Sequence, residues 1–347
     1  MAQETIGREP HFFDAHTHVQ FSAYEADRDA VIARAREAGV WMINVGTQLD
    51  TSRVAVELAE KCADEGNDGV CAAVGLHPVH TTKSFHDAQE LGGGEAAKEF
   101  TSRGEVFDRE QYRRLALHKK TVAIGECGLD YFRLDNVADS GGRDVEPCEE
   151  QVRKQKEAFI AQIELAIEIK KPLMIHCRDA FADLIEILKW AASRKNSSEE
   201  SFRRANPLYE PEVHKFYKNK FDNSLGGGVS PGVIHFFTGT PDDARALLDL
   251  GFSFTFGGAI TFPPRKGKDG AAAPATGTYD EVIKLIPIDR ILSETDAPYV
   301  APLFYRGKRN EPAYIIEIVK KLAELKNVSP EAMKKQIWEN AKRMFAI

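Results

Sequence analysis

Two histidines, His16 and His18, lie one residue apart in the segment FFDAHTHVQF (residues 12–21), which otherwise has the apolar character of a buried strand. Side chains alternate between the two faces of a strand, so both imidazoles are expected on one side. Asp14 shares that face two residues deeper, where it is expected to support the ligands rather than bind. A lone buried histidine is usually a core residue. Two at this spacing are a weak signal alone, because surface strands produce it by chance, so the rest of the sequence must show whether they have partners.

Further ionisable residues occur near the ends of other apolar runs. They are His77 in GLHP, Glu126 in GECGLDY, His176 and Arg178 in IHCRDA, His235 in IHFFTG, and Asp296 in SETDAP. Each is ambiguous alone, since a strand glutamate can be a paired structural acid and an aspartate can begin a turn. Together they are informative, because burying several imidazoles and carboxylates without partners is costly for each group. Divalent ions offset that cost, so the set predicts a metal centre.

The number of candidate ligands indicates two ions rather than one. The candidates are His16, His18, Glu126, His176, His235 and Asp296, more than one tetrahedral ion uses. A carboxylate can bridge two ions through its two oxygens, and Glu126 lies midway along the series of ligands. Two ions roughly 3.5–4 Å apart would share a hydroxide and polarise the bond to be hydrolysed. The ligand types do not fix the metal: histidines favour Zn²⁺ or Mn²⁺, whereas phosphodiester chemistry often uses Mg²⁺.

Charge points to the class of substrate. The chain has a net charge of −7, so it has no global attraction for nucleic acid. Two divalent ions, two carboxylates and a hydroxide would leave the site at about +1, which attracts an anionic group such as a phosphodiester. Arg178 and His77 are predicted to contact phosphate oxygens. Glu126 and Asp296 are the predicted catalytic residues, with Asp296 also placed to orient or deprotonate the attacking water.

These residues must be positioned by a repeating fold. Apolar runs typical of buried parallel strands cover residues 12–18, 40–47, 70–78, 121–131, 172–180, 232–239, 252–260 and 290–298. Segments with helical periodicity lie between them, at 25–39, 49–66, 148–171, 180–194 and 240–251. In the last of these, Asp242 and Asp243 suit the first turn and Gly251 the C-terminal stop.

Eight strands alternating with helices predict a single (β/α)8 TIM barrel, in which active sites lie at the C-terminal ends of the strands. The alternative is an open doubly wound sheet, but no GxGxxG follows the first strand. Polar, Gly-rich or charged stretches near 91–110, 133–149, 193–230 and 263–278 do not fit the repeat and are predicted to be surface insertions.

Composition limits the cellular context. Five cysteines form no CxxC pair, which indicates a reducing environment. The start of the chain has no apolar core, and no apolar run approaches membrane-spanning length, so no membrane partner is expected. We expect a cytoplasmic monomer, or a nuclear one in a eukaryote.

The motifs DAHTH, GLHP, GECGLDY, IHCRDA, IHFFTG, SETDAP and RNEP (residues 309–312) resemble those of the TatD family of metal-dependent deoxyribonucleases, within the amidohydrolase-like TIM barrels. The resemblance runs from the first strand to the C-terminal helix. It implies one ion on His16, His18 and Asp296, a second on His176 and His235, and Glu126 between them. It also implies 3′→5′ exonuclease action on single-stranded DNA or duplex ends.

Two other functions stay open on the sequence. The same barrel and metals occur in hydrolases of carboxylic esters or amides, such as aminoacyl-tRNA-type deacylases, and assays on DNA and on acyl substrates separate the two. A binding scaffold with a vestigial site is the third possibility, and the intact set of ligands argues against it.

Overall fold

The structure, a computed structural model, describes residues 11–83, 85–86, 100–132, 134, 148–193, 231–263 and 274–347. Most of the four predicted insertions lies outside these ranges. Of the described parts, residues 100–101 form a short strand, residues 109–110 begin a helix, residues 148–149 begin another, residue 193 ends a third, and residues 274–278 begin a fourth. The boundaries of the insertions therefore stay a prediction.

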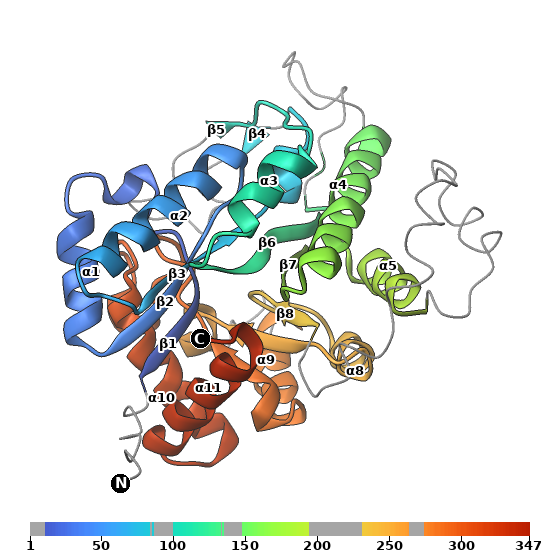
Figure 1. Ribbon diagram of the computed structural model, residues 1–347. Helices are drawn as coiled ribbons and strands as arrows, with labels where there is room; N and C mark the ends of the chain where they lie inside the picture. The colour runs from blue at the N-terminus through green and yellow to red at the C-terminus, as the bar shows by residue number, and fades with distance from the viewer. Residues whose placement is uncertain are drawn as a thin grey trace, which may run out of the picture.

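Eight parallel strands form one sheet in the order β1-β2-β3-β6-β7-β8-β9-β10, which confirms the predicted barrel (Figure 1). Their bounds are β1 Phe12–Thr17, β2 Val40–Val45, β3 Val70–Val74, β6 Thr121–Asp130, β7 Leu173–Arg178, β8 Gly232–Ile234, β9 Ser253–Phe256 and β10 Ile291–Ser293. The interior strands are buried along most of their length, which explains their continuous apolar sequences. A short antiparallel pair, β4 Phe85–His86 with β5 Phe100–Thr101, lies outside the barrel sheet.

Hydrogen bonds beyond the end of β10 join the last strand to the first. The Asp296 amide donates to the His16 carbonyl over 2.8 Å, and the His18 amide donates to the Ala297 carbonyl over 2.8 Å. Thr17 and Ala297 form a parallel bridge at the same place. The first and last strands are therefore joined at the predicted ligands themselves, His16 and His18 on one side and Asp296 on the other.

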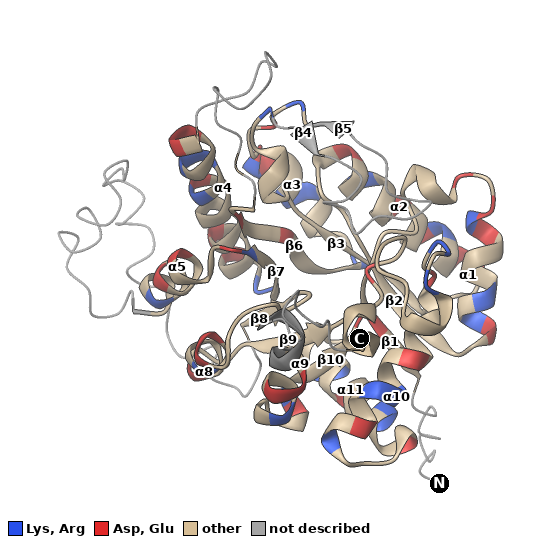
Figure 2. Cartoon of the chain, turned by 180° about the vertical axis from the view of Figure 1, so that it is seen from behind, with Lys and Arg blue, Asp and Glu red and all other residues tan. Residues whose placement is uncertain are grey.

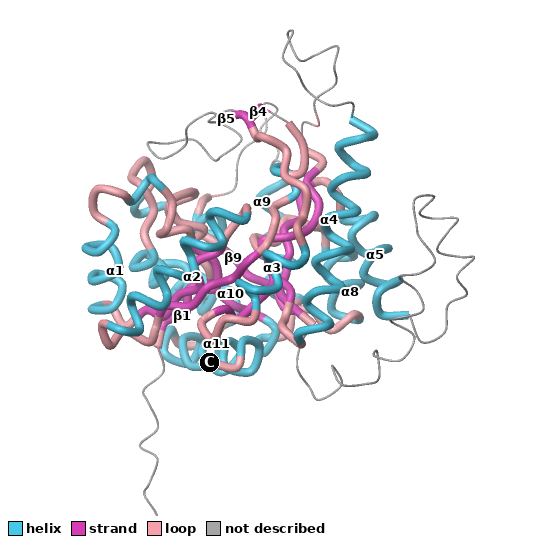
Figure 3. The backbone as a smooth tube through the Cα atoms, turned by 45° about the horizontal axis from the view of Figure 1, so that its top comes forward, coloured by secondary structure: helices cyan, strands magenta, loops and turns pink. Residues whose placement is uncertain are grey.

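Helices surround the strands (Figure 3). They are α1 Arg28–Glu37, α2 Leu49–Asp64, α3 Arg109–Ala116, α4 Cys148–Ile169, α5 Phe181–Ser193, α8 Pro241–Asp249, α9 Pro274–Leu285, α10 Ile315–Lys326 and α11 Pro330–Phe345. The five predicted helices are confirmed, including the acidic first turn of α8 and the positive φ of 88° at Gly251 beyond its end. Helices α3, α9, α10 and α11 were not individually predicted from sequence periodicity.

The apolar core fills the barrel and the layer beneath the helices. At the N-terminal end of the barrel, Trp338 of α11 packs against Trp41 with ring centroids 5.1 Å apart, and against Phe13 at 6.3 Å. Figure 1 shows α10 and α11 beside β1, so the end of the chain covers its beginning. This packing closes the end of the barrel opposite to the ionisable residues.

Charged side chains lie mostly on the outer helices, with acids and bases interspersed (Figure 2). None of the helices described is both long enough and apolar enough to cross a lipid bilayer.

Candidate metal centre

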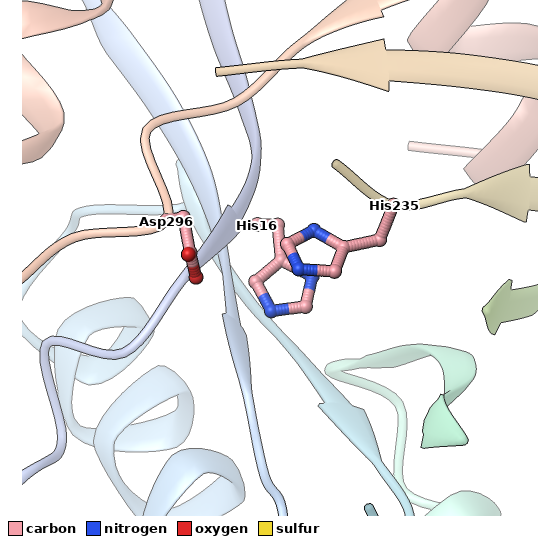
Figure 4. Close-up of side chains that lie close together, drawn as sticks. All are labelled: His16, His235 and Asp296. Carbon is pink, nitrogen blue, oxygen red and sulfur yellow. The ribbon is translucent and has the colours of Figure 1, made fainter. Parts of the chain in front are cut away.

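The six predicted ligands lie together at the C-terminal ends of the barrel strands. His16 is in β1, Glu126 in β6 and His176 in β7. His18 and His235 directly follow β1 and β8, and Asp296 lies three residues beyond the end of β10. Figure 4 shows His16 on β1 close to His235 and Asp296, which lie on the segments that follow β8 and β10. The rings of His16 and His235 stack with centroids 3.5 Å apart.

Glu126 lies at the centre and divides the histidines into two groups. Its Oε2 lies 3.3 Å from His16 Nε2 and 3.9 Å from His18 Nε2. Its Oε1 lies 3.1 Å from His176 Nδ1 and 3.6 Å from His235 Nε2. Among the predicted ligands, each carboxylate oxygen therefore faces a different pair of histidines, which is the geometry that a bridging carboxylate requires.

Asp296 belongs to the group on the Oε2 side. Its Oδ1 lies 3.5 Å from His18 Nε2, and the Nε2 atoms of His16 and His18 are 3.2 Å apart. His16, His235 and Asp296 also offer three ligand atoms within 4.8 Å of one another. The pattern brings Asp296 within reach of an ion held by the two histidines of the first strand.

Three of the four imidazoles use their remaining nitrogen to bind a fixed acceptor. His18 Nδ1 donates to the Val45 carbonyl over 2.7 Å. His176 Nε2 donates to Asp130 Oδ2 over 2.8 Å, and His235 Nδ1 donates to Glu294 Oε2 over 2.7 Å. Metal-binding histidines usually have such a partner, because it fixes the ring orientation and directs the other nitrogen to the ion.

These observations fit a divalent ion on each side of Glu126. Since a carbonyl only accepts, His18 carries its proton on Nδ1 when neutral, and its Nε2 lone pair faces the carboxylates. A lone pair beside a carboxylate is unfavourable without a cation between them. Separations of 3.2–3.9 Å between His16, His18 and Glu126 ligand atoms are also those of atoms sharing an ion at about 2.0–2.2 Å.

Both acidic ligands are ionised at neutral pH. Burial alone raises the pKa of Glu126, but the imidazoles of His77 and His16 together with hydrogen bonds hold it well below its ordinary value. Burial likewise raises the pKa of Asp296, and the hydrogen bond with His18 and the nearby histidines lower it overall. Burial and the neighbouring His235 lower the pKa of His16 to about 3, so that ring is neutral and able to ligate.

His77 lies beside these residues, but its Nδ1 accepts a hydrogen bond where that of His18 donates one. Its Nδ1 accepts from the Val79 amide over 3.2 Å, so a neutral ring carries its proton on Nε2. That Nε2 lies 3.2 Å from Glu126 Oε1. His77 therefore presents an N–H donor to the site, in contrast to the lone pair that His18 presents.

Arg178 lines the same cleft at the end of β7. Its guanidinium carbon lies 3.5 Å from the centroid of the Phe132 ring, which leaves the planar group stacked along one wall. Arg178 is partly exposed, as a residue that contacts a ligand entering from solvent must be.

Asp14 is fully buried and binds backbone and hydroxyl groups. Its Oδ1 accepts from the Thr295 amide over 2.8 Å and from the His16 amide over 3.3 Å, and its Oδ2 accepts from the Thr295 hydroxyl. It therefore joins the ligand-bearing backbone of the first strand to that of the last.

Three buried residues with a positioning role were not predicted from the sequence. They are Asp130 and Glu294, which orient His176 and His235, and Asn310 of the RNEP motif. The Asn310 amide donates to the carbonyls of Thr295 and Tyr299, on either side of Asp296. Asp130 lies four residues after Glu126 in GECGLDY, and Glu294 lies two residues before Asp296 in SETDAP. An even spacing along a strand places side chains on one face, and this was the available signal.

Helix α4 holds two of the strands that carry site residues. Gln162 exchanges hydrogen bonds with both backbone groups of Leu76, next to His77. Gln155, seven residues earlier on the same helix face, does the same for Asp130. Strands β3 and β6 approach closely here, since a Cβ at Gly75 would lie 2.7 Å from the Gly125 carbonyl carbon.

The backbone departs from regular geometry at the ligands. The pairing register shifts between Asp14 and Thr17 in β1, and between Ile124 and Cys127 in β6. Asp296 has a φ of 55° and Phe236, next to His235, a φ of 45°. Non-glycine residues rarely adopt such values, and they concentrate at functional sites where the surroundings enforce them.

Five of the six candidate ligands, all except the fully buried His16, line a cleft with a volume of about 1920 Å³. Besides the ionisable residues, its lining includes the aromatic side chains of Phe21, Phe132, Phe236 and Tyr299. The Phe21 ring stacks on His18 with centroids 4.5 Å apart. The candidate metal ligands therefore lie beside aromatic side chains in one cleft. Such a cleft suits a substrate in which a charged linkage lies next to flat aromatic groups.

Comparisons with known proteins show the family. The family described as "TatD related DNase" matches residues 13–346. The "Uncharacterized metal-dependent hydrolase YabD" of Bacillus subtilis is 33% identical over 336 residues, which cover 96% of this chain and 99% of the relative. The "3'-5' ssDNA/RNA exonuclease TatD" of Musicola paradisiaca is 30% identical over 341 residues, with 96% and 98% covered.

Solved structures show the same fold. The TatD homologue YjjV of Escherichia coli superposes with a TM-score of 0.64 at 23% identity, covering 97% of this chain and 98% of the other. A TatD family hydrolase of Entamoeba histolytica gives 0.65 at 21% identity, with 97% and 98% covered. The family match over nearly the whole chain, together with the buried histidine and carboxylate cluster, leads to one conclusion: this chain belongs to the TatD-related DNase family and is a metal-dependent hydrolase.

Proposed function

We propose that this protein is a two-metal 3′→5′ exonuclease that hydrolyses phosphodiester bonds at the ends of single-stranded DNA. The observation that carries the proposal is the position of Glu126, whose two oxygens face two separate pairs of the predicted histidine ligands. The name of the relative from Musicola paradisiaca supports the nuclease assignment.

In this proposal His16, His18 and Asp296 hold one ion and His176 and His235 the other, with Glu126 shared. The ions, when bound, would supply a nucleophile at neutral pH and neutralise charge on the reacting phosphate. Mg²⁺, Mn²⁺ and Zn²⁺ all accept these ligands.

The side chains of the protein bind and orient the substrate. Arg178 contacts a non-bridging phosphate oxygen from the wall of the cleft, and the Nε2–H of His77 donates to a second phosphate oxygen. Asp296 is ionised and partly exposed, so it can also accept a proton from the attacking water. Phe21 and Tyr299 flank the base of the terminal nucleotide on the cleft wall.

A cleavage assay tests the proposal. Purified protein is incubated with 5′-labelled single-stranded DNA and Mg²⁺ or Mn²⁺, and the expected product is a ladder that shortens from the 3′ end and disappears with chelator. His176→Ala is expected to reduce the rate more than about 100-fold, since a ligand outweighs a supporting residue. His118→Ala is the matched control, because His118 pairs with Glu60 at the opposite end of the barrel.

The result that would overturn the proposal is equally specific. It is an absence of metal-dependent nucleotide release combined with metal-dependent hydrolysis of a carboxylic ester or amide in the same preparation. That outcome would assign the site to acyl chemistry.

A further inference from the structure

The segment Leu303–Arg309 (LFYRGKR), which follows the Asp296 loop, has an unusual surface. Phe304 is 79% exposed, the most exposed aromatic side chain among the described large hydrophobic residues. Leu303 beside it is 46% exposed. Exposed aromatic surface is unfavourable in water, so a fixed position for it suggests a ligand.

Aromatic rings connect Phe304 to the cleft. The Phe304 ring lies 5.0 Å from that of Tyr305, and Tyr305 stacks on Tyr314 with centroids 3.6 Å apart and planes within 2°. Tyr314 lines the cleft that holds the candidate metal ligands. The rings therefore form a continuous row from the rim of the cleft to the exposed Phe304.

Cations accompany this row. Lys308 lies 5.8 Å from the Tyr305 centroid and lines the cleft, and Arg306 lies 5.0 Å over the ring of Phe262. Among the residues that the structure describes, no carboxylate lies within ion-pair distance of Arg306 or Lys308. The segment is thus locally basic in a chain with a net charge of −7.

The segment is held firmly in place. Arg309 binds Asp27 Oδ2 over 2.6 Å and the Ala23 carbonyl over 2.7 Å. Glu311 accepts two hydrogen bonds from Arg34, at 2.9 and 2.8 Å. An anchored segment presents its side chains in one arrangement, so a ligand binding to it would pay little entropy for ordering the protein.

We infer that the Phe304–Lys308 surface binds the single strand on the 5′ side of the nucleotide undergoing cleavage. A base stacks on Phe304, and Arg306 and Lys308 contact neighbouring phosphates. Alternating aromatic and cationic groups are what a single strand requires, because every base has a flat face and every linkage a negative charge. The inference rests on the proposed exonuclease function and adds the route by which a longer substrate reaches the site.

Kinetics on substrates of two lengths test this surface. Phe304→Ala is expected to raise KM for a single-stranded oligonucleotide by about tenfold and to leave kcat unchanged. A dinucleotide, which does not reach Phe304, should keep its KM. Phe304→Trp should restore the oligonucleotide value, and Leu117→Ala, which truncates another exposed apolar side chain at 54% exposure, is the control.

Binding measurements separate this inference from the proposed function. The metal-loaded protein is titrated into a labelled phosphorothioate single strand that resists hydrolysis. Phe304→Ala should weaken binding by the same factor, and Arg306→Ala with Lys308→Ala should reduce the salt dependence of log K by about 0.7 for each cation removed.

Each outcome has a distinct meaning. Wild-type protein that binds the strand through Phe304 but releases no nucleotides would overturn the proposed exonuclease function and support strand binding by the Phe304–Lys308 surface. An active exonuclease whose Phe304→Ala variant binds and cleaves the oligonucleotide normally would overturn the surface alone. Loss of a wild-type dimer in that variant, with unchanged KM, would assign the surface to a second copy of the chain and also overturn the inference.

Discussion

The imidazole of His176 lies between two carboxylates, with Nε2 2.8 Å from Asp130 Oδ2 and Nδ1 3.1 Å from Glu126 Oε1. Asp130 is itself fixed, since its backbone exchanges two hydrogen bonds with the side chain of Gln155 in α4. The helix therefore positions Asp130, Asp130 positions His176, and His176 faces Glu126. The orientation of this candidate ligand depends on a residue two contacts away from it.

Asp130→Asn tests this chain of contacts. The amide keeps the size of the carboxylate but loses its charge and weakens its hold on the His176 ring. Metal affinity on the His176 side is expected to fall about 10- to 100-fold. Isothermal titration with Mn²⁺ measures it. Asp242→Asn, in the exposed first turn of α8, is the control, and equal affinity in the two variants would contradict the assignment.

Glu294→Gln tests the equivalent contact on His235. Glu294 is fully buried and accepts from His235, from the Phe236 amide and from the Thr255 hydroxyl. A glutamine offers one acceptor oxygen, so one of these donors loses its partner, at a cost of about 1–3 kcal/mol. We expect reduced metal content in the purified protein together with a lower melting temperature. Unchanged metal content would show that Glu294 does not orient His235.

Asn310→Ala tests whether the Asp296 loop needs its internal support. The substitution removes hydrogen bonds to the Thr295 and Tyr299 carbonyls, and is expected to lower the free energy of unfolding by roughly 2–3 kcal/mol and kcat by at least about tenfold. Denaturant unfolding and steady-state kinetics measure the two effects.

The chain provides a matched control for that variant. Asn340 is also a buried asparagine whose amide donates to two carbonyls, those of Ile288 and Ile291 at the other end of β10. Asn340→Ala should lose similar stability while kcat of the folded protein is unchanged. Equal losses of kcat in both variants would show that the effect of Asn310 is only on stability.

Metal binding should depend on pH in a defined direction. Burial lowers the pKa of His176 and of His235, but their carboxylate partners outweigh it and raise these values to about 10 and about 9 in the metal-free protein. Both rings therefore hold a proton at pH 7.5 that an ion must displace, so affinity should rise with pH up to about 9–10. Calorimetry in two buffers of different ionisation enthalpy measures the protons released, and zero release would contradict this.

The same shifts predict how the metal-free protein loses stability. The unfolded pKa of histidine is about 6.5, below the folded values, so protonated His176 and His235 favour the folded state. This contribution is fully present below pH 6.5 and is lost as the pH rises through about 9 and 10. Denaturation of chelator-treated protein at pH 6, 8 and 10 should show the decline, and Asp130→Asn should reduce it.

Arg178→Ala tests substrate binding apart from metal binding. The side chain stacks on Phe132 and lines the cleft, so its loss should raise KM for a phosphodiester by about tenfold and leave metal content unchanged. Arg245→Ala, an exposed arginine of α8, is the control. A fall in metal content would indicate that Arg178 supports the ligands instead.

The sequence was sufficient to predict the barrel and the gathering of the ionisable residues at one end of it, because buried parallel strands are continuously apolar and an ionisable residue in one is conspicuous. His235 in IHFFTG is an example. It was not sufficient to assign Asp130 or Glu294, since an acid near a strand end has several explanations until its partner is known. The register shifts of β1 and β6 beside the candidate ligands were not predicted either, although His16 and His18 lie on one side as alternation predicts.

The helices that were not predicted have a physical explanation as well. Helix α3 has eight residues with only two buried, Tyr112 and Ala116, so its apolar stripe is too short to recognise. Helix α11 is different, because its buried residues Met333, Ile337, Ala341, Met344 and Phe345 recur at helical spacing. Its periodicity was therefore an available signal.

The most direct test of the central claim is to locate bound metal by anomalous scattering from crystals grown with Mn²⁺. The account predicts two ions that share Glu126, one bound by His16, His18 and Asp296 and the other by His176 and His235. A single ion, or ions that do not contact Glu126, would contradict it.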